Sequence, residues 1–399
     1  MTAIGNMNAN SEASPLSPQW RAHALALAFG TFAVGTDAFV IAGVLPSIAD
    51  TLHVTPAAAG QLVTVFSLAY AILTPILGAL TAEWSRRAAL VTALVVFAIG
   101  NAITAIVPDF GLVLASRVIA AAGAGLFTAN ASATAAMLAG PQYRGRAIAL
   151  VMLGLTSSLI FGAPLGTAVS NLSDWRMTMW LVTALGLLAG VVVLWRLPDV
   201  REAGASGLME RFRPLRSRSV QIDLLCTLVV FTGVYIPYTY ISVVYAPVTG
   251  AQPQWLGAML LIFGVAGTAG NLLAGRLADR FGPVPVIVGG SLGLAIVFLL
   301  VPLLNSTLPS ALVVVALSGL FAFSLTTPQQ HLLISHSAGG KLSLVTGLYQ
   351  SAIYAAVSLS GVVGALAIGW GAADRLTLVA VVPIVLAALM TWQHAGKSF

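Results

Sequence analysis

The chain has 399 residues, of which 58% are hydrophobic and only 8% are charged. A soluble domain carries about 25% charged residues. A chain this poor in charge could not cover a water-facing surface, so the composition excludes a soluble protein and places most of the surface in lipid. The formal net charge of +6 could indicate nucleic acid, but we interpret it as the mark of the cytoplasmic side of a membrane protein.

Apolar runs broken by turn residues predict an all-α membrane protein with twelve transmembrane helices. One such helix needs roughly 20 apolar residues, and twelve of them with short turns fill nearly the whole chain. Typical turn residues separate the runs at Pro108-Asp109, Gly140-Pro141, Gly282-Pro283 and Gly339-Gly340. The predicted spans are 21–46, 58–80, 88–107, 111–138, 145–170, 177–197, 221–248, 254–277, 284–303, 309–334, 342–368 and 374–394.

The predicted domain organisation is two six-helix bundles, 21–197 and 221–394, joined by a hydrophilic cytoplasmic linker at 198–220. Residues 1–20 are polar and lack the basic start of a secretory signal, so we expect a disordered cytoplasmic tail there. A second short cytoplasmic tail is expected at 395–399.

The Lys and Arg residues support this helix count and orient the chain. With both termini inside, only Arg176 and Arg375 fall outside, and Arg117 lies within the fourth helix. Cytoplasmic loops carry the excess of Lys and Arg, so we expect a multi-pass protein of the bacterial inner membrane with both termini cytoplasmic. The residues placed inside are Arg21, Arg86, Arg87, Arg144, Arg146, Arg196, Arg201, Arg211, Arg213, Arg216, Arg218, Arg276, Arg280, Lys341 and Lys397.

Two similar loops occupy the same place in each half of the chain. The first runs from Gly78 to Arg87 and the second from Gly275 to Pro283, 197 positions later. Parallel six-helix halves are the architecture of a rocking transporter with its site between the halves. The loop residues that we expect to stabilise one conformer as a latch are Gly78, Glu83, Arg86, Arg87, Gly275, Asp279 and Arg280.

The second loop, with Gly275, Asp279, Arg280 and Gly282, resembles the signature loop of the major facilitator superfamily. The resemblance implies that the glycine allows close helix approach and that the aspartate accepts hydrogen bonds at a neighbouring helix N-terminus. The first loop departs from the pattern, because Ala82 stands where Asp is usual, Glu83 where Arg is usual and Ser85 where Gly is usual. Glu83 is the candidate to replace the missing carboxylate. The alternative for both loops is simple anchoring at the basic side of the membrane.

Small residues recur at every fourth position of the predicted fifth helix, which places them on one face. They are Gly154, Ser158, Gly162, Gly166 and Ser170, with Pro164 among them. The run from Gly162 to Gly166 resembles the helix-5 motif of the superfamily's antiporters, which implies that this face meets the opposite half. The alternative is ordinary tight helix packing without directional meaning.

Other segments resemble the drug–proton antiporter branch of the superfamily, near the arabinose-efflux, chloramphenicol-resistance and purine-efflux permeases. These segments are residues 35–46, Arg117 with Gly123 and Gly125, Asp174-Trp175-Arg176, and residues 233–240. The chain departs from that pattern at Ala121, where the first glycine is usual, and at Ala38, where related permeases often have an acidic residue.

Asp37 and Arg117 are the ionisable residues deep within the predicted spans. A charge at membrane depth is costly unless it is paired or faces water, and both residues lie at comparable depth. We therefore expect them to pair and to act as the proton-coupling switch. The alternative is a fixed structural ion pair. Asp223, near the cytoplasmic edge, is expected to be an interfacial or capping residue.

Polar and aromatic residues within the spans predict a substrate cavity that suits neutral or weakly charged amphipathic solutes. His331 and His336 are five positions apart and do not share a helix face, so the spacing predicts no metal site. A phosphate-binding loop is also missing, so we expect no cofactor and a proton gradient as the energy source. The candidate cavity residues are Tyr70, Asn130, Tyr235, Tyr238, Asn271, Gln329, Tyr349 and Gln350.

The sequence thus predicts a secondary active transporter, not an enzyme. We expect a monomer in the lipid bilayer that exports small amphipathic molecules or drugs in exchange for protons. Export of sugars or purine nucleosides is the alternative within the same mechanism. Uptake by symport and a membrane sensor without transport activity are the remaining readings.

Overall fold

The computed structural model describes residues 19–201, 213–250, 252–337 and 342–395. In this part of the chain, twelve helices are long and apolar enough to cross a membrane, which confirms the predicted number. Residues 1–18 and 396–399 of the predicted tails, residues 202–212 of the linker with Arg211, the Gly339-Gly340 turn and Lys341 lie outside the described residues. The boundaries of the two bundles therefore remain a prediction.

The first six spans run with few interruptions. Gly140 has a φ of 71° and interrupts α4, so the fourth span ends there and the fifth runs from Gln142 to Leu172, as the predicted turn requires. The elements are α1 (Gln19–Thr51), α2 (Pro56–Leu80), α3 (Arg86–Ile106), α4 (Phe110–Ser157), the π-helical turn η1 (Ser158–Gly162), α5 (Ala163–Leu172) and α6 (Trp175–Arg196).

Two of the later six spans are broken. The predicted span 221–248 ends as a regular helix at Thr239 and continues as two single turns, and the predicted span 309–334 is divided at Leu325. The elements are η2 (Arg213–Arg216), α8 (Arg218–Thr239), α9 (Ile241–Val244), α10 (Ala246–Thr249), α11 (Pro253–Phe281), α12 (Pro283–Leu304), α13 (Leu308–Ser324), α14 (Thr326–His336), α15 (Leu342–Gly369), η3 (Ala373–Arg375) and α16 (Leu376–Ala395).

Local sequence explains where several helices begin. The side chains of Thr55, Ser85 and Asp109 each accept a hydrogen bond from a backbone N–H of the first turn that follows, which satisfies a donor that has no partner within the helix. Gly282 takes a φ of 85° immediately before Pro283, the first residue of α12. Proline is favoured at this position because its N–H is not needed there.

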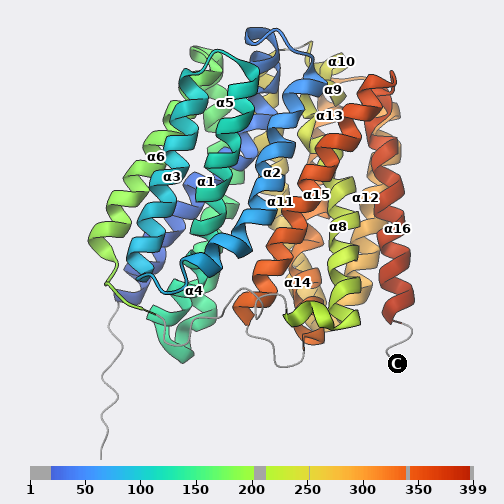
Figure 1. Cartoon of the computed structure of the whole chain (residues 1–399). Coiled ribbons are helices and arrows are strands. Elements are labelled where there is room, and N and C mark those ends of the chain that lie inside the picture. Colours follow the sequence, from blue (N-terminus) through green and yellow to red (C-terminus); the bar gives the residue numbers. More distant parts are fainter. Residues whose placement is uncertain (1–18, 202–212, 251, 338–341, 396–399) are drawn as a thin grey trace, which may run out of the picture.

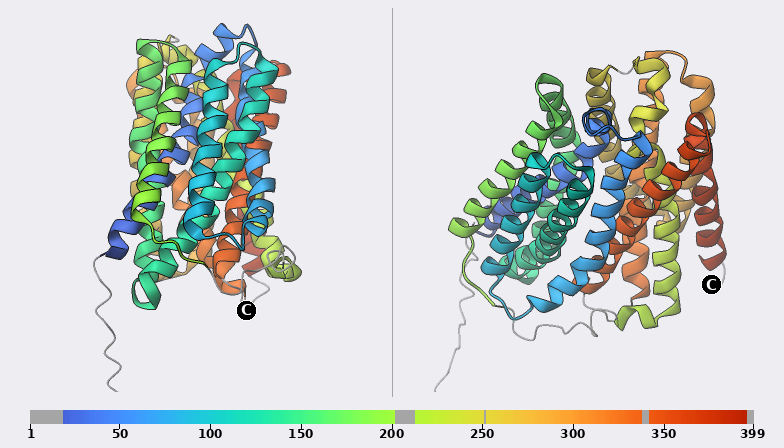
Figure 2. Two further views of the ribbon diagram at one scale, coloured as in Figure 1. Left: turned by 60° about the vertical axis from the view of Figure 1, so that its left-hand side comes forward. Right: turned by 45° about the horizontal axis from the view of Figure 1, so that its top comes forward.

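The two halves lie side by side, the first in blue to green and the second in yellow to red (Figures 1 and 2). Helix α2 packs along α15, and α5 packs along α11. The second helix of each half therefore meets the fifth helix of the other half, as expected for two halves related by a two-fold axis. These two seams are the contacts that would have to change if the halves rocked.

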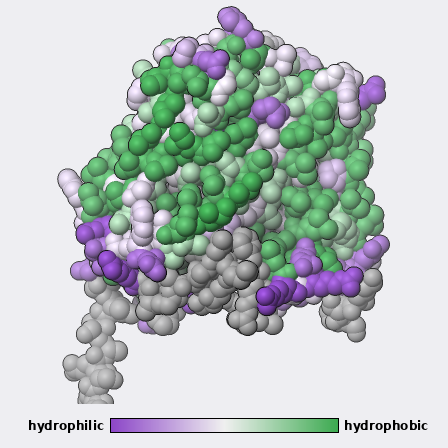
Figure 3. Space-filling view, in the orientation of Figure 1, coloured by the Kyte–Doolittle hydropathy of each residue, from purple (hydrophilic) through white to green (hydrophobic). Residues whose placement is uncertain are grey.

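The sides of the molecule are apolar and the polar residues gather toward its two ends (Figure 3). Large apolar side chains such as Leu172, Trp195 and Trp370 are exposed, as expected of a surface that faces lipid. We call one end the basic end. It contains the start of α1, the α2–α3 loop, the end of α6 and the ends of α14 and α16.

Candidate transport cavity and buried charge pair

A cavity of about 400 Å³ lies between the two halves. In the fifth span its wall extends from Gly145 to Leu159, a distance of about 21 Å along a helix. Since Gly145 is the fourth residue of that span and a side chain built on it would meet open space, the cavity reaches from mid-depth toward the basic end.

Tyr240 follows Thr239, a residue of the cavity wall, and fills the seam between α2 and α15. Its ring fits against Gly60 of α2 and Gly364 of α15, and its hydroxyl donates a hydrogen bond of 2.8 Å to the carbonyl of Gly361. Any side chain at Gly60 or Gly364 would collide with that ring. The seam between α2 and α15 is therefore tightly closed at Tyr240 in this conformer.

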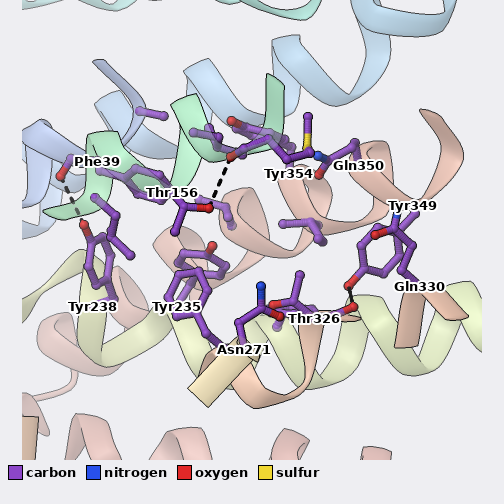
Figure 4. Close-up of a pocket in the computed structure, with 18 of the residues that line it drawn as sticks. Phe39, Thr156, Tyr235, Tyr238, Asn271, Thr326, Gln330, Tyr349, Gln350 and Tyr354 are labelled. Carbon is purple, nitrogen blue, oxygen red and sulfur yellow. Dashed lines mark hydrogen bonds between the residues drawn. The ribbon is translucent and has the colours of Figure 1, made fainter. Parts of the chain in front are cut away.

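The described residues that line the cavity have aromatic, aliphatic, thioether, amide or hydroxyl side chains, apart from Gly145, and none of them is Asp, Glu, Lys, Arg or His. Figure 4 shows tyrosines and amides of the second half, with Phe39 and Thr156 of the first half, around the same space. Such a wall offers stacking surfaces and a few hydrogen-bonding groups without a fixed charge, which suits a neutral amphipathic solute. The labelled members include Tyr235, Tyr238, Asn271, Gln330, Tyr349, Gln350 and Tyr354.

Five of the eight predicted cavity residues lie on this wall, namely Tyr235, Tyr238, Asn271, Tyr349 and Gln350. Each of the five belongs to the second half of the chain. The tyrosine hydroxyls are partly engaged: Tyr349 donates to the carbonyl of Thr326 at 2.8 Å and Tyr238 to that of Phe39 at 3.3 Å. The Tyr238 bond joins α8 to α1 across the two halves.

The structure places the other three elsewhere. Asn130 accepts a hydrogen bond of 2.5 Å from Arg86 inside the first half. Gln329 is buried away from the cavity, whereas Gln330 lines it, because consecutive helical residues are rotated by about 100°. Tyr70 lies one layer behind the wall and stacks on Tyr354 with ring centres 3.6 Å apart.

Sequence reasoning missed the hydroxyl residues of the wall. Ser67, Thr156, Thr239, Thr326 and Thr327 all line the cavity. Ser and Thr are common in transmembrane helices, where they can bond to the backbone one turn earlier, so their presence alone gave no signal. The break at Leu325, which turns Thr326 and Thr327 toward the cavity, was not recognised from the sequence.

Asp37 and Arg117 form a fully buried, bidentate ion pair. The Nη1 and Nη2 atoms of Arg117 donate to the two carboxylate oxygens of Asp37 at 2.9 and 3.0 Å. Nη1 also donates to Oδ1 of Asn101 at 3.0 Å, and the guanidinium lies 4.5 Å from the centre of the Phe66 ring. The predicted pairing is therefore present, with geometry that only arginine can make.

The pair is separated from the cavity by one layer of protein. Ala38 and Phe39, the next residues of α1, line the cavity, whereas Asp37 and Arg117 are completely buried within the first half. A solute in the cavity would not touch the carboxylate in this conformer. Helix α1, which carries Asp37 and also contributes Ala38 and Phe39 to the wall, connects the pair to the cavity.

The prediction that the small residues of helix 5 pack against the opposite half is wrong. A side chain on Gly154 would collide with the carbonyl of Ala28, and one on Gly162 with Thr36. Both partners belong to α1, in the same half. The periodicity indicated a tightly packed face, but it could not indicate which neighbour that face meets.

Helix 5, the fifth span from Gln142 to Leu172, meets the opposite half through a different face. In that contact the glycines belong to α11. A β-carbon on Gly264 would lie 2.7 Å from the carbonyl oxygen of Leu159, and one on Gly257 would lie 3.9 Å from that of Pro164. Gly264 thus allows α11 to approach the backbone of helix 5 at its π-helical turn. Close approach across the seam depends on α11 rather than on the helix 5 motif.

The two loops expected to act as latches differ in their contacts. In the first, the backbone N–H of Arg86 donates to the carbonyl of Val200 at 2.8 Å, and Arg87 lies 3.8 Å from the carboxylate of Asp199 at the surface, where an ion pair contributes little. Arg86 and the Asn130 that it contacts belong to the same half.

In the second loop, Asp279 and Arg280 are exposed. Within the described chain, no hydrogen bond or ion pair is formed by the side chain of Asp279 or of Glu83, so the suggestion that Glu83 replaces the missing carboxylate gains no support. A β-carbon on Gly275 would lie 3.7 Å from Thr327, an ordinary contact. The expected need for glycine at that position is therefore wrong for this conformer.

Asp223 lies near the end of its helix, as expected of an interfacial residue, but it does not cap the helix, because Ser217 is the N-cap of α8. It is buried near the basic end of α8, and its Oδ2 atom lies 2.7 Å from Nδ1 of His336. The two residues are 113 positions apart, and the predicted spans did not indicate that they would meet.

Comparison with known proteins places the chain in one group. The sequence model of the Major Facilitator Superfamily matches residues 27–361. The MFS-type transporter YbcL of Bacillus subtilis is 34% identical over 350 residues, which cover 87% of this chain and 89% of that protein. A chloramphenicol resistance protein of Streptomyces lividans is 32% identical over 270 residues, which cover 67% and 69%.

The fold is also found in solved structures of transporters. A solved D-xylose–proton symporter superposes with a TM-score of 0.74 at 19% identity, covering 93% of this chain and 97% of that chain. An identity this low shows the shared fold and carries no information on the substrate.

Proposed function

Because the chain belongs to the major facilitator superfamily, we propose that it exports neutral amphipathic molecules across the inner membrane in exchange for protons. The observation that carries this proposal is the uncharged, aromatic cavity between the halves, with a buried carboxylate one residue behind its wall. The related chloramphenicol resistance protein of Streptomyces lividans makes chloramphenicol, a neutral aromatic amide, the first solute to test.

The cavity wall supports a solute that carries an aromatic ring and a few polar groups. Tyr235, Tyr238 and Tyr354 offer ring faces, and Asn271 with Gln330 offers amide donors and acceptors (Figure 4). A charged solute would lose its hydration there without gaining a counter-charge. We therefore expect anionic and strongly cationic solutes to be poor substrates.

Helix α1 supports the coupling of this cavity to the proton. Phe39 contacts the cavity and accepts a hydrogen bond from Tyr238 of the other half, while Asp37 lies two residues earlier on the same helix. If rocking of the halves shifted α1, it would pull the carboxylate from Arg117 and expose it to a proton. Protonation would in turn weaken the ion pair, so that solute and proton use α1 in alternation.

Purified protein in proteoliposomes would test the proposal directly. With an imposed pH gradient, we expect chloramphenicol to move against its own gradient in the direction opposite to the protons, and we expect collapse of the gradient by a protonophore to stop it. Transport that proceeds unchanged without a proton gradient would remove the antiport mechanism. Absence of transport for a whole panel of neutral amphipathic solutes would remove the substrate class.

Replacing amide side chains of the cavity should weaken substrate recognition. We expect Asn271→Ala and Gln330→Ala each to raise the KM for the transported solute by about tenfold, because loss of one hydrogen bond in a dry site costs about 1–2 kcal/mol. The matched control is Gln254→Ala, which removes an exposed amide from the far end of α11. Equal KM values in all three variants would show that the solute binds elsewhere.

The proposed orientation places the basic end in the cytoplasm. In a Cys226→Ser background, Glu83→Cys at the basic end and Gln252→Cys at the opposite end introduce one exposed thiol each. We expect a membrane-impermeant maleimide to label position 252 and not position 83 in intact cells. The reverse pattern would invert the topology and make the described conformer outward-facing.

A further inference from the structure

The basic end of the second half brings together three potential metal ligands that are far apart in the sequence. Asp223 lies on the second turn of α8, His336 ends α14, and His394 lies at the end of α16. One ligand atom from each residue lies within 4.8 Å of the ligand atoms of the other two. The two imidazole rings are nearly perpendicular, with centres 5.6 Å apart.

We propose that Asp223, His336 and His394 form a binding site for a divalent transition-metal ion, with zinc as the best match. Two imidazoles and one carboxylate are an established donor set for zinc, which binds such atoms at about 2.0–2.2 Å and leaves a fourth position for water. Ligand atoms around a tetrahedral ion of that size are about 3.3 Å apart. Ligand atoms that lie within 4.8 Å of one another would therefore have to approach by at most about 1.5 Å to surround an ion, which side-chain rotation can provide.

The burial of Asp223 is the electrostatic reason for a cation here. Its side chain is only 6% exposed, and its neighbour His336 compensates a negative charge only when protonated. An uncompensated carboxylate at this depth is costly. A divalent ion held by the carboxylate and two neutral imidazoles removes that cost without requiring a protonated histidine.

A simple ion pair between Asp223 and His336 explains less of the geometry. It requires one imidazole, whereas a second imidazole converges on the same point from α16. Cys226, one turn farther along α8, is buried, and α8 packs closely along α16 beside the cluster. This packing presents the ligands from a rigid support, as a metal site needs.

An ion at this place would connect α14 to α8 and α16. Helix α14 begins after the break at Leu325 and contributes Thr326, Thr327 and Gln330 to the cavity wall. The metal would hold the other end of α14, so we expect a bound ion to stabilise the basic end of the second half. The inference does not depend on the identity of the transported solute or on proton coupling.

The test is zinc binding by the full chain, purified in detergent with an affinity tag that contains no histidine and treated with a chelator. We expect titration with Zn²⁺ alone, followed by calorimetry, to give one ion per chain and a higher melting temperature. X-ray absorption at the zinc edge should show two imidazoles among nitrogen and oxygen ligands only. No saturable binding by the intact chain would overturn the proposal.

Substitutions locate the site. We expect His336→Ala and His394→Ala to weaken zinc binding at least about tenfold, whereas His331→Ala, an exposed histidine of the same helix, should bind as the unaltered chain does. Asp223→Asn keeps the shape of the side chain and removes the charge, so it serves if an alanine variant fails to fold. Unchanged affinity in folded Asp223→Asn and His394→Ala would place the ion elsewhere and refute the assignment.

Discussion

Replacing Asp37 with asparagine is expected to abolish proton-driven efflux while leaving solute exchange in place. Asparagine matches the protonated acid in size, so binding and rocking should persist, but it cannot release a proton. The direct measurement compares efflux driven by a pH gradient with counterflow exchange, which requires no net proton movement. We expect the first to fall at least about tenfold and the second to stay within about twofold, if a proton transfer is the only step removed.

If the ion pair serves only the fold, Asp37→Asn should mainly lower the yield of folded protein. A double variant separates this effect from the loss of proton coupling. Asp37→Asn leaves Arg117 buried with only Asn101 and the Phe66 ring as partners, and breaking a buried pair can cost about 3–5 kcal/mol. The double variant Asp37→Asn/Arg117→Gln removes both charges and should recover folded yield. It should still lack proton-driven efflux if Asp37 carries the proton.

The same pair of variants can refute the assignment. Proton-driven efflux at the original rate in Asp37→Asn, or its return in the double variant, would show that the carboxylate serves only the fold. Arg117→Lys offers a graded control, because lysine keeps the charge but cannot make the two parallel hydrogen bonds to Asp37. We expect it to retain part of the coupling.

Substitution of Gly264 by leucine is expected to stop turnover without preventing folding. A β-carbon at Gly264 would already lie 2.7 Å from the carbonyl oxygen of Leu159 across the seam between the halves. Overpacking of this kind costs about 1–3 kcal/mol, and here the seam can open instead of the fold. We therefore expect solute counterflow to fall at least about tenfold in a protein that remains monodisperse.

Two other glycine variants distinguish this mechanism from general disruption. Gly154→Leu collides with the Ala28 carbonyl inside the first half, so we expect loss of folded protein. Gly289→Leu meets open space and should transport normally. Normal counterflow by Gly264→Leu would contradict the prediction that turnover requires close contact at this seam.

The conformational effect of Gly264→Leu can be measured independently. Thr64 is buried in the α2–α15 seam against Gly361. Gly264→Leu acts on the other seam, between α11 and η1, and we expect rocking of the halves to open both seams together. A cysteine at position 64, in the Cys226→Ser background, should then become accessible to an external thiol reagent. Equal protection of position 64 with and without the leucine would show that the seam stays closed.

Much of the architecture could be predicted from the sequence because exclusion of water from lipid acts on each segment separately. Twenty apolar residues must span the bilayer wherever they occur in the chain, and every backbone polar group must be satisfied within its own helix. The turns at Asp109, Gly140 and Gly282 follow from local backbone preferences. The pairing of Asp37 with Arg117 was predictable too, because two internal charges of opposite sign have few other partners.

What remained for the tertiary structure was the rotation of each helix about its axis and the identity of its neighbours. A one-residue difference on α14 separates Gln330, on the cavity wall, from Gln329, which is buried behind it. The small face of helix 5 meets α1 instead of the other half, and Asp223 meets His336 and His394 from two other helices. Helix formation depends on neighbours in sequence, whereas these contacts depend on packing among segments more than a hundred residues apart, and only the folded bundle decides them.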